Sequence, residues 1–477
     1  MTTSSRPPAE PLYWRRAHIV QPLLALAYFE RATAHIVCGW LPKIESVEIK
    51  VELGQQQHRT MVHAAKLERA YASALKFDGA ADLAVPRRYR SAMKAIDGSI
   101  TTPELLRRLY GDVKPALAVH YARVIAAANP TLDAPLLEIL RAAHAELRRQ
   151  IAWAKPRIGR RPRGAPRFSL ASPGSAGARS NAKRCGDTID ARGPRIARAD
   201  WLWKPLARVP ECARPPAIAN KKPGELLPSV IDHPGSRRAG GGFFSNITNS
   251  ELATMELYAR CVYEHPDMPE AFHQDYSRIT ADEARHAAIA MRWARRLGRP
   301  FGSFAISTDI YTFNYQYEAC PAGSKQELLW RLMLQGTLRE GLIIEGYPTQ
   351  AKKLRFRELA EAARVAEVMA EEEIAHVEAA LKWTRFLCDG DNQRAHDERE
   401  RAHAYYAHHY NEARKRYVAE HPDDAIEDTR QLVAYRKLSG ETFPFSLAVH
   451  VNRAARRSIG FTEQEIDQIC NWGYLNP

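Results

Sequence analysis

The sequence predicts an all-α protein in which two four-helix bundles are joined by a long basic connector. Apolar residues recur with helical spacing on both sides of a central segment, and the alternation typical of strands is scarce. The central segment is rich in Pro, Gly, Ser and Arg and has no sustained apolar period. We therefore expect two bundles, at 1–154 and 246–388, a connector at 155–245, and a helical appendage at 389–477.

Four helices are predicted in the first bundle. Prolines in Trp40-Leu-Pro42 and Asn129-Pro130 cannot continue a helix, and a less periodic region at 78–97 separates the middle pair. The predicted helices cover 17–40, 46–75, 102–127 and 132–154.

Four more helices are predicted in the second bundle. They are separated by His265-Pro266, by Leu297-Gly-Arg-Pro300 and by Gly346-Tyr-Pro348. These helices cover 247–264, 268–297, 325–346 and 352–388. The appendage begins with a polar, His-rich helix and closes with a short helix after Thr462.

The composition bounds the class of protein. With 45% apolar and 26% charged residues the chain has the balance of a globular protein, and no run of about 18 uncharged apolar residues could span a membrane. The first ten residues are polar and lack the apolar core of a signal peptide, so we expect a cytoplasmic protein. The seven cysteines form no Cys-x-x-Cys pair, which indicates reduced thiols rather than disulfides or a zinc ribbon.

Most of the net charge of +14 is local. The segment from Lys155 to Arg198 contains twelve Lys and Arg residues and only two acidic residues, Asp187 and Asp190. A solvated linker is the simpler interpretation of this segment, and an RNA-binding arm is the alternative. Phe168 is its only aromatic residue, which argues against base stacking.

Two related motifs carry the predicted chemistry. Asp282-Glu283-Ala-Arg-His286 and Glu372-Glu373-Ile-Ala-His376 each place a Glu three residues before a His, on one face of a helix. A single such pair is usually a solvated surface pair. Two of them on alternate helices of one bundle indicate a buried metal site.

Each motif needs one more Glu from the preceding helix, because bundles that bind two metal ions use this arrangement. Glu256 and Glu340 are chosen because each lies two to three turns before a proline that ends its helix. Glu251 and Glu345, five residues away, point elsewhere by ~140° and are second choices. The predicted ligands are suited to Fe(II) or Mn(II) rather than to zinc or copper; they are Glu256, Glu283, His286, Glu340, Glu373 and His376.

The second bundle resembles an uncharacterised branch of the ferritin-like di-iron carboxylate superfamily, catalogued as a domain of unknown function. The resemblance covers about 246–388 and rests on Glu251-Leu-Ala-Thr-Met-Glu-Leu257, Met268–Phe272, Glu283–His286, Leu338–Pro348 and Glu371–Val377. Asn249 departs from it, because that branch often has a His there. The resemblance implies a non-haem dimetal site whose ligands are the six residues above.

The first bundle is similar to a second ferritin-like half, through Trp40-Leu-Pro-Lys-Ile44 and Glu48-Ile-Lys50. Its ligands are largely replaced, because Thr60-Met-Val-His63 and Leu147-Arg-Arg-Gln150 stand where Glu-x-x-His is expected. Only Glu30 and His63 remain. We expect a degenerate, metal-free copy.

The resemblance implies an O2-dependent oxygenase or oxidase that acts on a small organic substrate with two iron ions, or manganese, and an external electron donor. Glu283 and Glu373 would bridge the ions, while Glu256 and Glu340 would bind terminally. The absent side chains of Gly336 and Gly341 suggest a substrate entry, and Thr337 could donate a hydrogen bond to the site or to its own helix. An RNA-modifying hydroxylase, a metal-storage ferroxidase and a non-catalytic structural role are the alternatives. The substrate, the reaction outcome, the electron donor, the choice between Fe and Mn, and the oligomeric state stay open.

Overall fold

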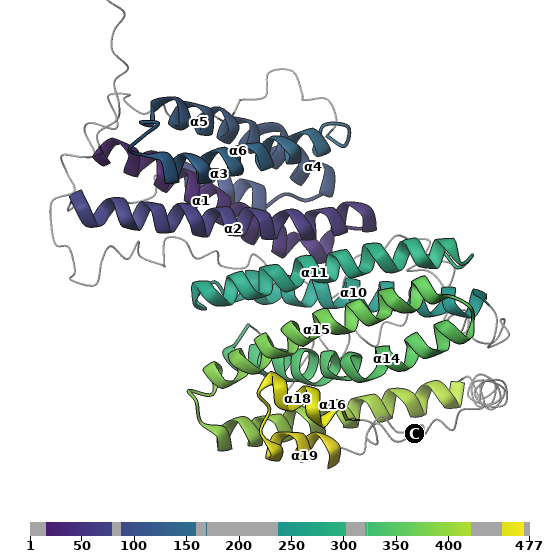
Figure 1. Cartoon of the computed structure of the whole chain (residues 1–477). Helices are drawn as coiled ribbons and strands as arrows, with labels where there is room; N and C mark the ends of the chain where they lie inside the picture. The colour runs from purple at the N-terminus through teal and green to yellow at the C-terminus, as the bar shows by residue number, and fades with distance from the viewer. Residues whose placement is uncertain are drawn as a thin grey trace, which may run out of the picture. The chain divides into compact units, whose positions relative to one another are not determined.

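The computed structural model describes residues 16–78, 87–158, 168, 237–301, 320–321, 323–420 and 451–471 (Figure 1). Their regular structure is helical without any strand, which confirms the all-α prediction. These residues form two compact units. Unit 1 comprises the described residues of Met1–Lys43, Leu53–Arg208 and Val262–Ser277, and unit 2 those of Ile44–Glu52, Val209–Cys261 and Arg278–Pro477.

The N-terminal helices agree with their predicted limits to within a few residues. They are α1 (Arg16–Trp40), the 3-10 turn η1 (Leu41–Lys43), α2 (Val47–Asp78), α3 (Arg87–Asp97), α4 (Thr102–Leu106), the π-helical segment η2 (Arg107–Val113), α5 (Lys114–Ala127) and α6 (Ala134–Ala154). Helix α3 was not predicted. Its only apolar pattern is Tyr89, Met93 and Ile96, which are spaced by four and three residues and are buried in an otherwise basic helix.

The C-terminal helices carry the predicted metal ligands. They are α10 (Arg237–Glu264), α11 (Glu270–Arg296), α13 (Lys325–Arg331), the π-helical segment η5 (Leu332–Arg339), α14 (Glu340–Phe356), α15 (Ala360–Leu387), α16 (Asn392–Glu420), α18 (Arg453–Ile459) and α19 (Glu463–Asn471). Ser324 caps the N-terminus of α13, and its hydroxyl accepts a hydrogen bond from the Glu327 amide at 3.1 Å.

Helix α10 begins at Arg237, well before the predicted start of its bundle. It includes the run Gly240–Gly242, which the sequence assigned to the connector. A Cβ on Gly240 would lie 2.8 Å from Leu359, and one on Gly241 would lie 2.9 Å from Arg299. These glycines therefore permit close helix packing. Residues 159–167 and 169–236, most of the predicted connector, lie outside the described residues.

The predicted helix end at Pro348 is wrong. Pro348 lies inside α14, which continues to Phe356, and the chain reverses at Glu358, where φ is +58°. A proline removes one helical hydrogen bond, but Tyr347, Ala351 and Leu354 beside it are buried. Core packing thus carries the helix past its proline.

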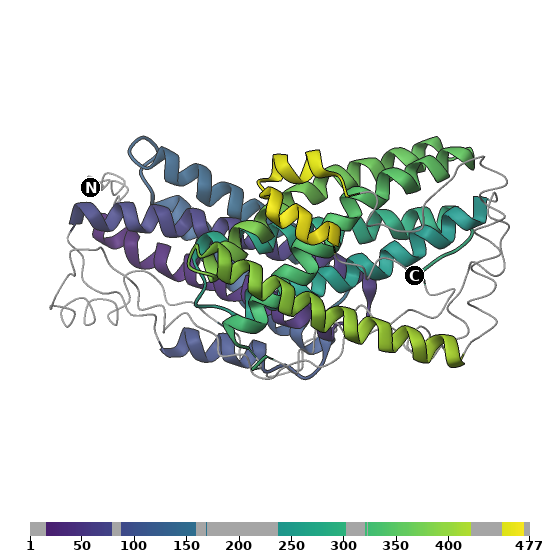
Figure 2. The same cartoon turned by 90° about the horizontal axis from the view of Figure 1, so that it is seen from below.

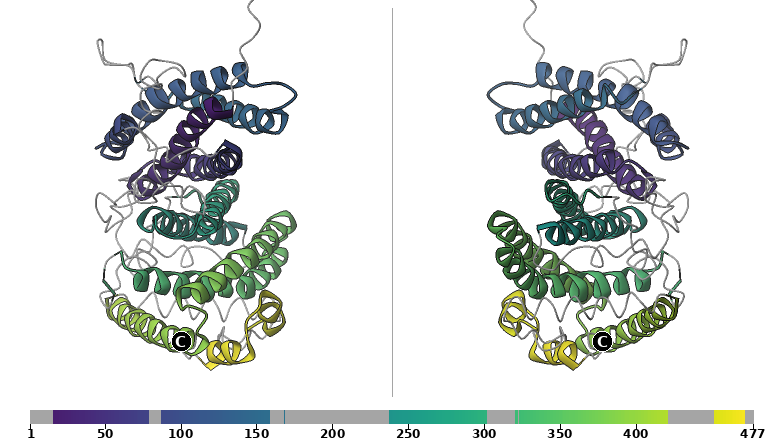
Figure 3. Two further views of the ribbon diagram at one scale, coloured as in Figure 1. Left: turned by 90° about the vertical axis from the view of Figure 1, so that its left-hand side faces the viewer. Right: turned by 90° about the vertical axis from the view of Figure 1, so that its right-hand side faces the viewer.

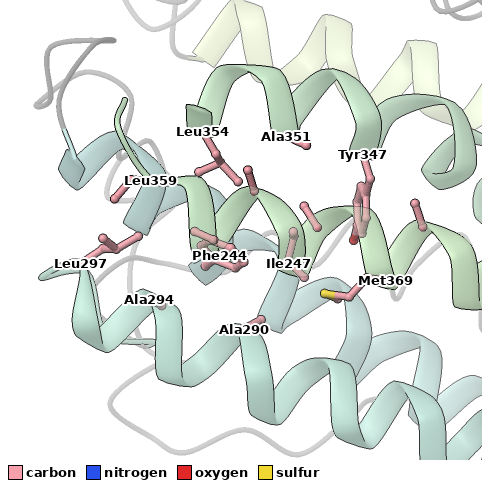
Figure 4. Packing of buried hydrophobic residues seen from close by; sticks show 14 residues of the cluster. Phe244, Ile247, Ala290, Ala294, Leu297, Tyr347, Ala351, Leu354, Leu359 and Met369 are labelled. Atoms are coloured by element: carbon pink, nitrogen blue, oxygen red, sulfur yellow. The ribbon is translucent and has the colours of Figure 1, made fainter. Parts of the chain in front are cut away.

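One hydrophobic core in unit 2 collects side chains from four helices (Figure 4). Alanines predominate where α11 and α15 face this core, which lets the helix backbones approach closely. The core includes Phe244 and Ile247 of α10, Ala290 and Ala294 of α11, Tyr347, Ala351 and Leu354 of α14, and Ala362, Ala366 and Met369 of α15. These four helices form the frame for the ligand residues.

The C-terminal helices of unit 2 pack onto this frame. Helix α16 contacts α13, η5 and α15, and α18 contacts α15 and α19 (Figures 2 and 3). The described helices include none with the length and apolar character needed to cross a membrane.

Candidate metal centre

Four buried side chains from three helices converge in unit 2. Glu251 comes from α10, Glu283 and His286 come from α11, and Glu373 comes from α15. One potential ligand atom from each lies within 4.8 Å of the others. This cluster could hold a metal ion.

The register of the helices brings these residues to one level. Glu283 and Glu373 lie equally far from the first residues of their helices, which are Glu270 in α11 and Ala360 in α15. Glu251 lies at the same distance from Glu264, the last residue of α10, which is the helix that turns into α11. At ~1.5 Å per residue, all three lie about 20 Å from the adjoining helix end.

Both imidazoles point their Nδ1 atoms into the cluster. His376 Nδ1 lies 2.6 Å from Glu373 Oε2 and 3.0 Å from Glu283 Oε1. His286 Nδ1 lies 3.2 Å from Glu373 Oε1 and 3.5 Å from Glu283 Oε2. Glu283 and Glu373 thus each approach both imidazoles.

The outer nitrogens contact carboxylates in a reciprocal pattern. His286 Nε2 lies 2.7 Å from Glu372 Oε2, and His376 Nε2 lies 3.5 Å from Asp282 Oδ2. Arg285 donates to Glu372 at 2.9 Å and to Asp282 at 3.1 Å. The acid that precedes the Glu of one motif therefore orients the His of the other, as partners of metal-binding histidines do.

Glu340 lies beside this cluster but outside the group of four. It is fully buried, and its Oε1 accepts hydrogen bonds at 3.0 Å from Tyr258 and from Gln335. Burial, and then the Glu373 carboxylate, raise the pKa of Glu340 to about 8. Tyr347 donates to Glu251 at 2.8 Å, so both lone-helix glutamates accept a bond from a buried phenol.

The structure places Glu251 in the cluster, whereas the sequence favoured Glu256. Glu256 is buried in an ion pair with Lys50 of α2 and does not belong to the cluster. The sequence argument placed a helix end at Pro348, and so expected each lone Glu to lie two to three turns before the end of its helix. Glu340 in fact begins α14 and so lies more than four turns from the helix end at Phe356, and the similar depth on α10 is that of Glu251. Counting both arms of a helical hairpin from its turn could have identified Glu251.

Glu345, the other second choice, is also neutralised by a cation. Its Oε1 accepts a hydrogen bond from Arg456 Nε at 2.9 Å. Each of the two lone-Glu helices thus carries two buried glutamates five residues apart, and a Lys or Arg from another segment binds the one that faces away from the cluster.

The electrostatics of the cluster show a shortage of positive charge. Burial, and then Glu373, raise the pKa of Glu283 well above its usual range. Burial disfavours the charged imidazoles, but the surrounding carboxylates raise the pKa of His286 and of His376 well above 6.5. Burial likewise opposes ionisation of Glu373, but His376 and His286 hold its pKa below the usual value.

Several ligand-type atoms have no hydrogen-bond partner among the described residues, although a buried polar atom without one costs ~1–3 kcal/mol. They are both Glu283 oxygens, Glu373 Oε1, Glu340 Oε2 and His286 Nδ1. Metal ions held by these residues would give such atoms a partner. The donor set of oxygen and imidazole nitrogen without thiolate is the type that Fe and Mn accept.

The proposed substrate entry at Gly336 and Gly341 is filled. A Cβ on Gly336 would lie 2.3 Å from that of Ala380, and one on Gly341 would lie 2.5 Å from Arg456 Nη2. Thr337 donates to the Met333 carbonyl at 2.7 Å, so its hydroxyl bonds to its own helix. These small residues serve packing rather than access.

In unit 1, other residues occupy positions that correspond along their helices to those of the cluster in unit 2. Thr60 in α2, which begins at Val47, and Leu147 in α6, which begins at Ala134, lie at the depth that Glu283 and Glu373 have in their helices. Lys114 directly follows the π-helical η2, as Glu340 follows η5.

Polar contacts join these positions in unit 1. Lys114 donates to Gln150, and Gln150 donates to Thr60 at 3.4 Å. Glu30 accepts a bond from Tyr121 at 2.9 Å. Burial raises the pKa of Glu30 to about 7 and lowers that of Lys114 to about 8, while their mutual attraction opposes both shifts. Burial also lowers the pKa of His63 to about 4.

Comparison with known proteins gives one match. The model of a family described as a protein of unknown function, DUF455, matches residues 204–467, which is more than half of the chain and includes every residue of the cluster. No curated protein and no solved structure matches the chain.

Proposed function

The chain belongs to the DUF455 family, whose function is unknown, and we propose that it is a non-haem di-iron oxidoreductase that uses O2 to oxidise a small organic molecule. The observation that carries this proposal is the buried cluster of carboxylates and imidazoles, several of whose atoms make no hydrogen bond with the described residues. The reaction type is taken from the resemblance to ferritin-like proteins, and the buried cluster supports metal binding.

Charge balance favours two divalent ions over one. Six buried glutamates lie on the four core helices of unit 2 near this level, namely Glu251, Glu256, Glu283, Glu340, Glu345 and Glu373. Lys50 neutralises one and Arg456 neutralises another. Four negative charges remain, which two divalent ions would balance, and buried charges without compensation are costly.

Glu283 and Glu373, each of which approaches both histidines, would hold the ions together with His286 and His376. Glu251 and Glu340 would complete the set. Bound ferrous ions would supply the electrons for O2 reduction. Manganese would accept the same donors.

Residues outside the ligand set would hold this centre in place. Asp282 and Glu372 fix the ring orientation of the two histidines. Burial disfavours ionisation of Asp282, but its contacts with His376 and Arg285 bring its pKa down to about 2, so it stays an acceptor. Tyr258 and Tyr347 fix one oxygen each of Glu340 and Glu251.

The same proposal interprets unit 1 as a copy of the metal unit that has lost its ligands. The ammonium of Lys114, following a π-helix as Glu340 does, supplies positive charge to Glu30 and Glu146 in place of a metal ion. Only unit 2 would then bind metal.

Metal analysis and O2 uptake test the proposal. Protein from iron-replete cells should carry about two Fe or Mn per chain, and anaerobically loaded Fe(II) protein should consume O2 in proportion to its dinuclear sites. Glu283→Ala should abolish both. Oxidation of tens of Fe(II) per chain in a cage-sized particle, seen by light scattering, would instead indicate a metal store.

A further inference from the structure

Arg456 is a buried cation beside the helix that carries Glu340. It belongs to α18 and is 2% exposed. Its Nε donates to Glu345 Oε1 at 2.9 Å, and its Nη1 donates to the Thr337 carbonyl at 3.2 Å. The ring of Phe461 lies 5.3 Å from the guanidinium. The Arg456 side chain thus contacts the backbone of η5 and an acidic side chain of α14.

The carbonyl that Arg456 binds lies in an irregular part of that helix. Thr337 belongs to the π-helical η5, and the Glu340 amide donates to the Gln335 carbonyl five residues earlier. π-Helical turns are rare and are less favourable than α-helix, so they persist where surrounding contacts hold them. The direction in which Glu340 leaves the backbone depends on this turn.

Gly341 makes room for the guanidinium. A Cβ at this position would lie 2.5 Å from Nη2 and 2.8 Å from Nη1 of Arg456. Arg456 therefore contacts the chain three residues before Glu340, one residue after it and five residues after it. No other residue type at 341 would leave this approach unchanged.

The segment that presents Arg456 is itself fixed to two ligand-bearing helices. The Asn452 amide donates to Glu345 of α14 at 3.1 Å, and the Asn452 side chain caps α18. Arg385 of α15 donates to the Gly460 carbonyl at 2.9 Å and to Glu465 at 3.1 Å. The C-terminal helices are therefore anchored to both helices.

We propose that Arg456 is a positioning residue that holds the π-helical turn before Glu340 and thereby directs this carboxylate toward the metal cluster. The effect on metal rests on the proposed function. The effect on the π-helical turn does not, because it concerns contacts within the protein alone.

Hydrogen–deuterium exchange of the metal-free chain tests the first part. Arg456→Met should raise exchange in peptides that cover Leu332–Glu345 at least about tenfold, because the turn loses its anchor. Arg457→Met is the matched control, because Arg457 is the next residue in the chain, is half-exposed, and pairs with Glu463 on the surface. Equal exchange in the two variants, or an increase spread evenly over unit 2, would overturn the proposal.

Metal titration tests the second part. Arg456→Met should weaken metal binding about 10–100-fold, the usual effect of removing a residue that supports a ligand. Adding Glu345→Gln restores the charge balance but not the Thr337 contact, so the double variant should stay weak. Full recovery in the double variant would show that charge alone matters and would refute the positioning role.

A milder variant covers the case in which Arg456→Met fails to fold. Gly341→Ala should push the guanidinium tip aside while leaving its charge buried, and the same local rise in exchange is expected. If the wild-type chain binds no metal, the proposed function fails, and the exchange comparison still decides whether Arg456 holds the turn.

Discussion

Removing the charge of Lys50 should destabilise unit 2 strongly, and removing its partner as well should restore much of the loss. The side chains of Lys50 and Glu256 are 1% and 0% exposed. Breaking a buried ion pair on one side costs ~3–5 kcal/mol, because the remaining charge is left without compensation. We therefore expect Lys50→Met to lower the free energy of unfolding of unit 2 by about this amount.

In Lys50→Met with Glu256→Gln no charge is buried, and only an amide needs hydrogen bonds. Its cost should be ~1–3 kcal/mol. The double variant should then be more stable than Lys50→Met by about 2 kcal/mol, and a double-mutant cycle that also includes Glu256→Gln measures the coupling between the two residues.

Native-state hydrogen exchange provides the assay. The slowest amides of α10 report the free energy of unfolding of their own unit, so unit 1 does not obscure the measurement. If the losses in unfolding free energy of the two single variants simply add in the double variant, the two residues are not coupled. The claim that Lys50 neutralises Glu256 would then be wrong.

The ligand set gives three more expectations. Glu251→Gln should lose most of the bound metal whereas Glu256→Gln should keep it, as elemental analysis of the purified variants would show; the opposite result would restore the choice made from sequence. Asp282→Asn and Glu372→Gln should each weaken metal binding about 10–100-fold in titrations, because each frees one histidine ring; unchanged affinity would mean that these contacts do not orient the rings. His63→Ala should leave the metal content unchanged, and a loss equal to that of Glu251→Gln would place metal in unit 1.

The helical frame was largely predictable from sequence, because it depends on local periodicity. The predicted limits of α1, α2, α6 and α11 lie within a few residues of the observed ones, and α19 follows Thr462 as expected. The errors were the unpredicted helix α3, the late start expected for α10 and the helix end expected at Pro348. Pro348 removes one backbone hydrogen bond from α14, but core packing by residues of the same helix outweighs that loss.

The core of the candidate site was also visible in sequence, and its outer members were not. Glu283, His286 and Glu373 follow from the spacing within each motif, which is fixed by one helix turn. The choice between Glu251 and Glu256 depends on which one meets Lys50, a residue far away in the sequence. No local pattern contains that information.

The Lys114 ammonium in unit 1 has a consequence for how stable the two units would be in a cell starved of iron. Lys114 is covalently part of its helix and cannot be removed by a chelator, whereas an ion in unit 2 would stabilise the fold only by RT ln(1 + [M]/Kd), about 2.7 kcal/mol at a hundredfold excess over Kd. Depletion would withdraw that contribution from unit 2 alone. Proteases that attack transiently opened segments would then cleave unit 2 first and leave unit 1 intact.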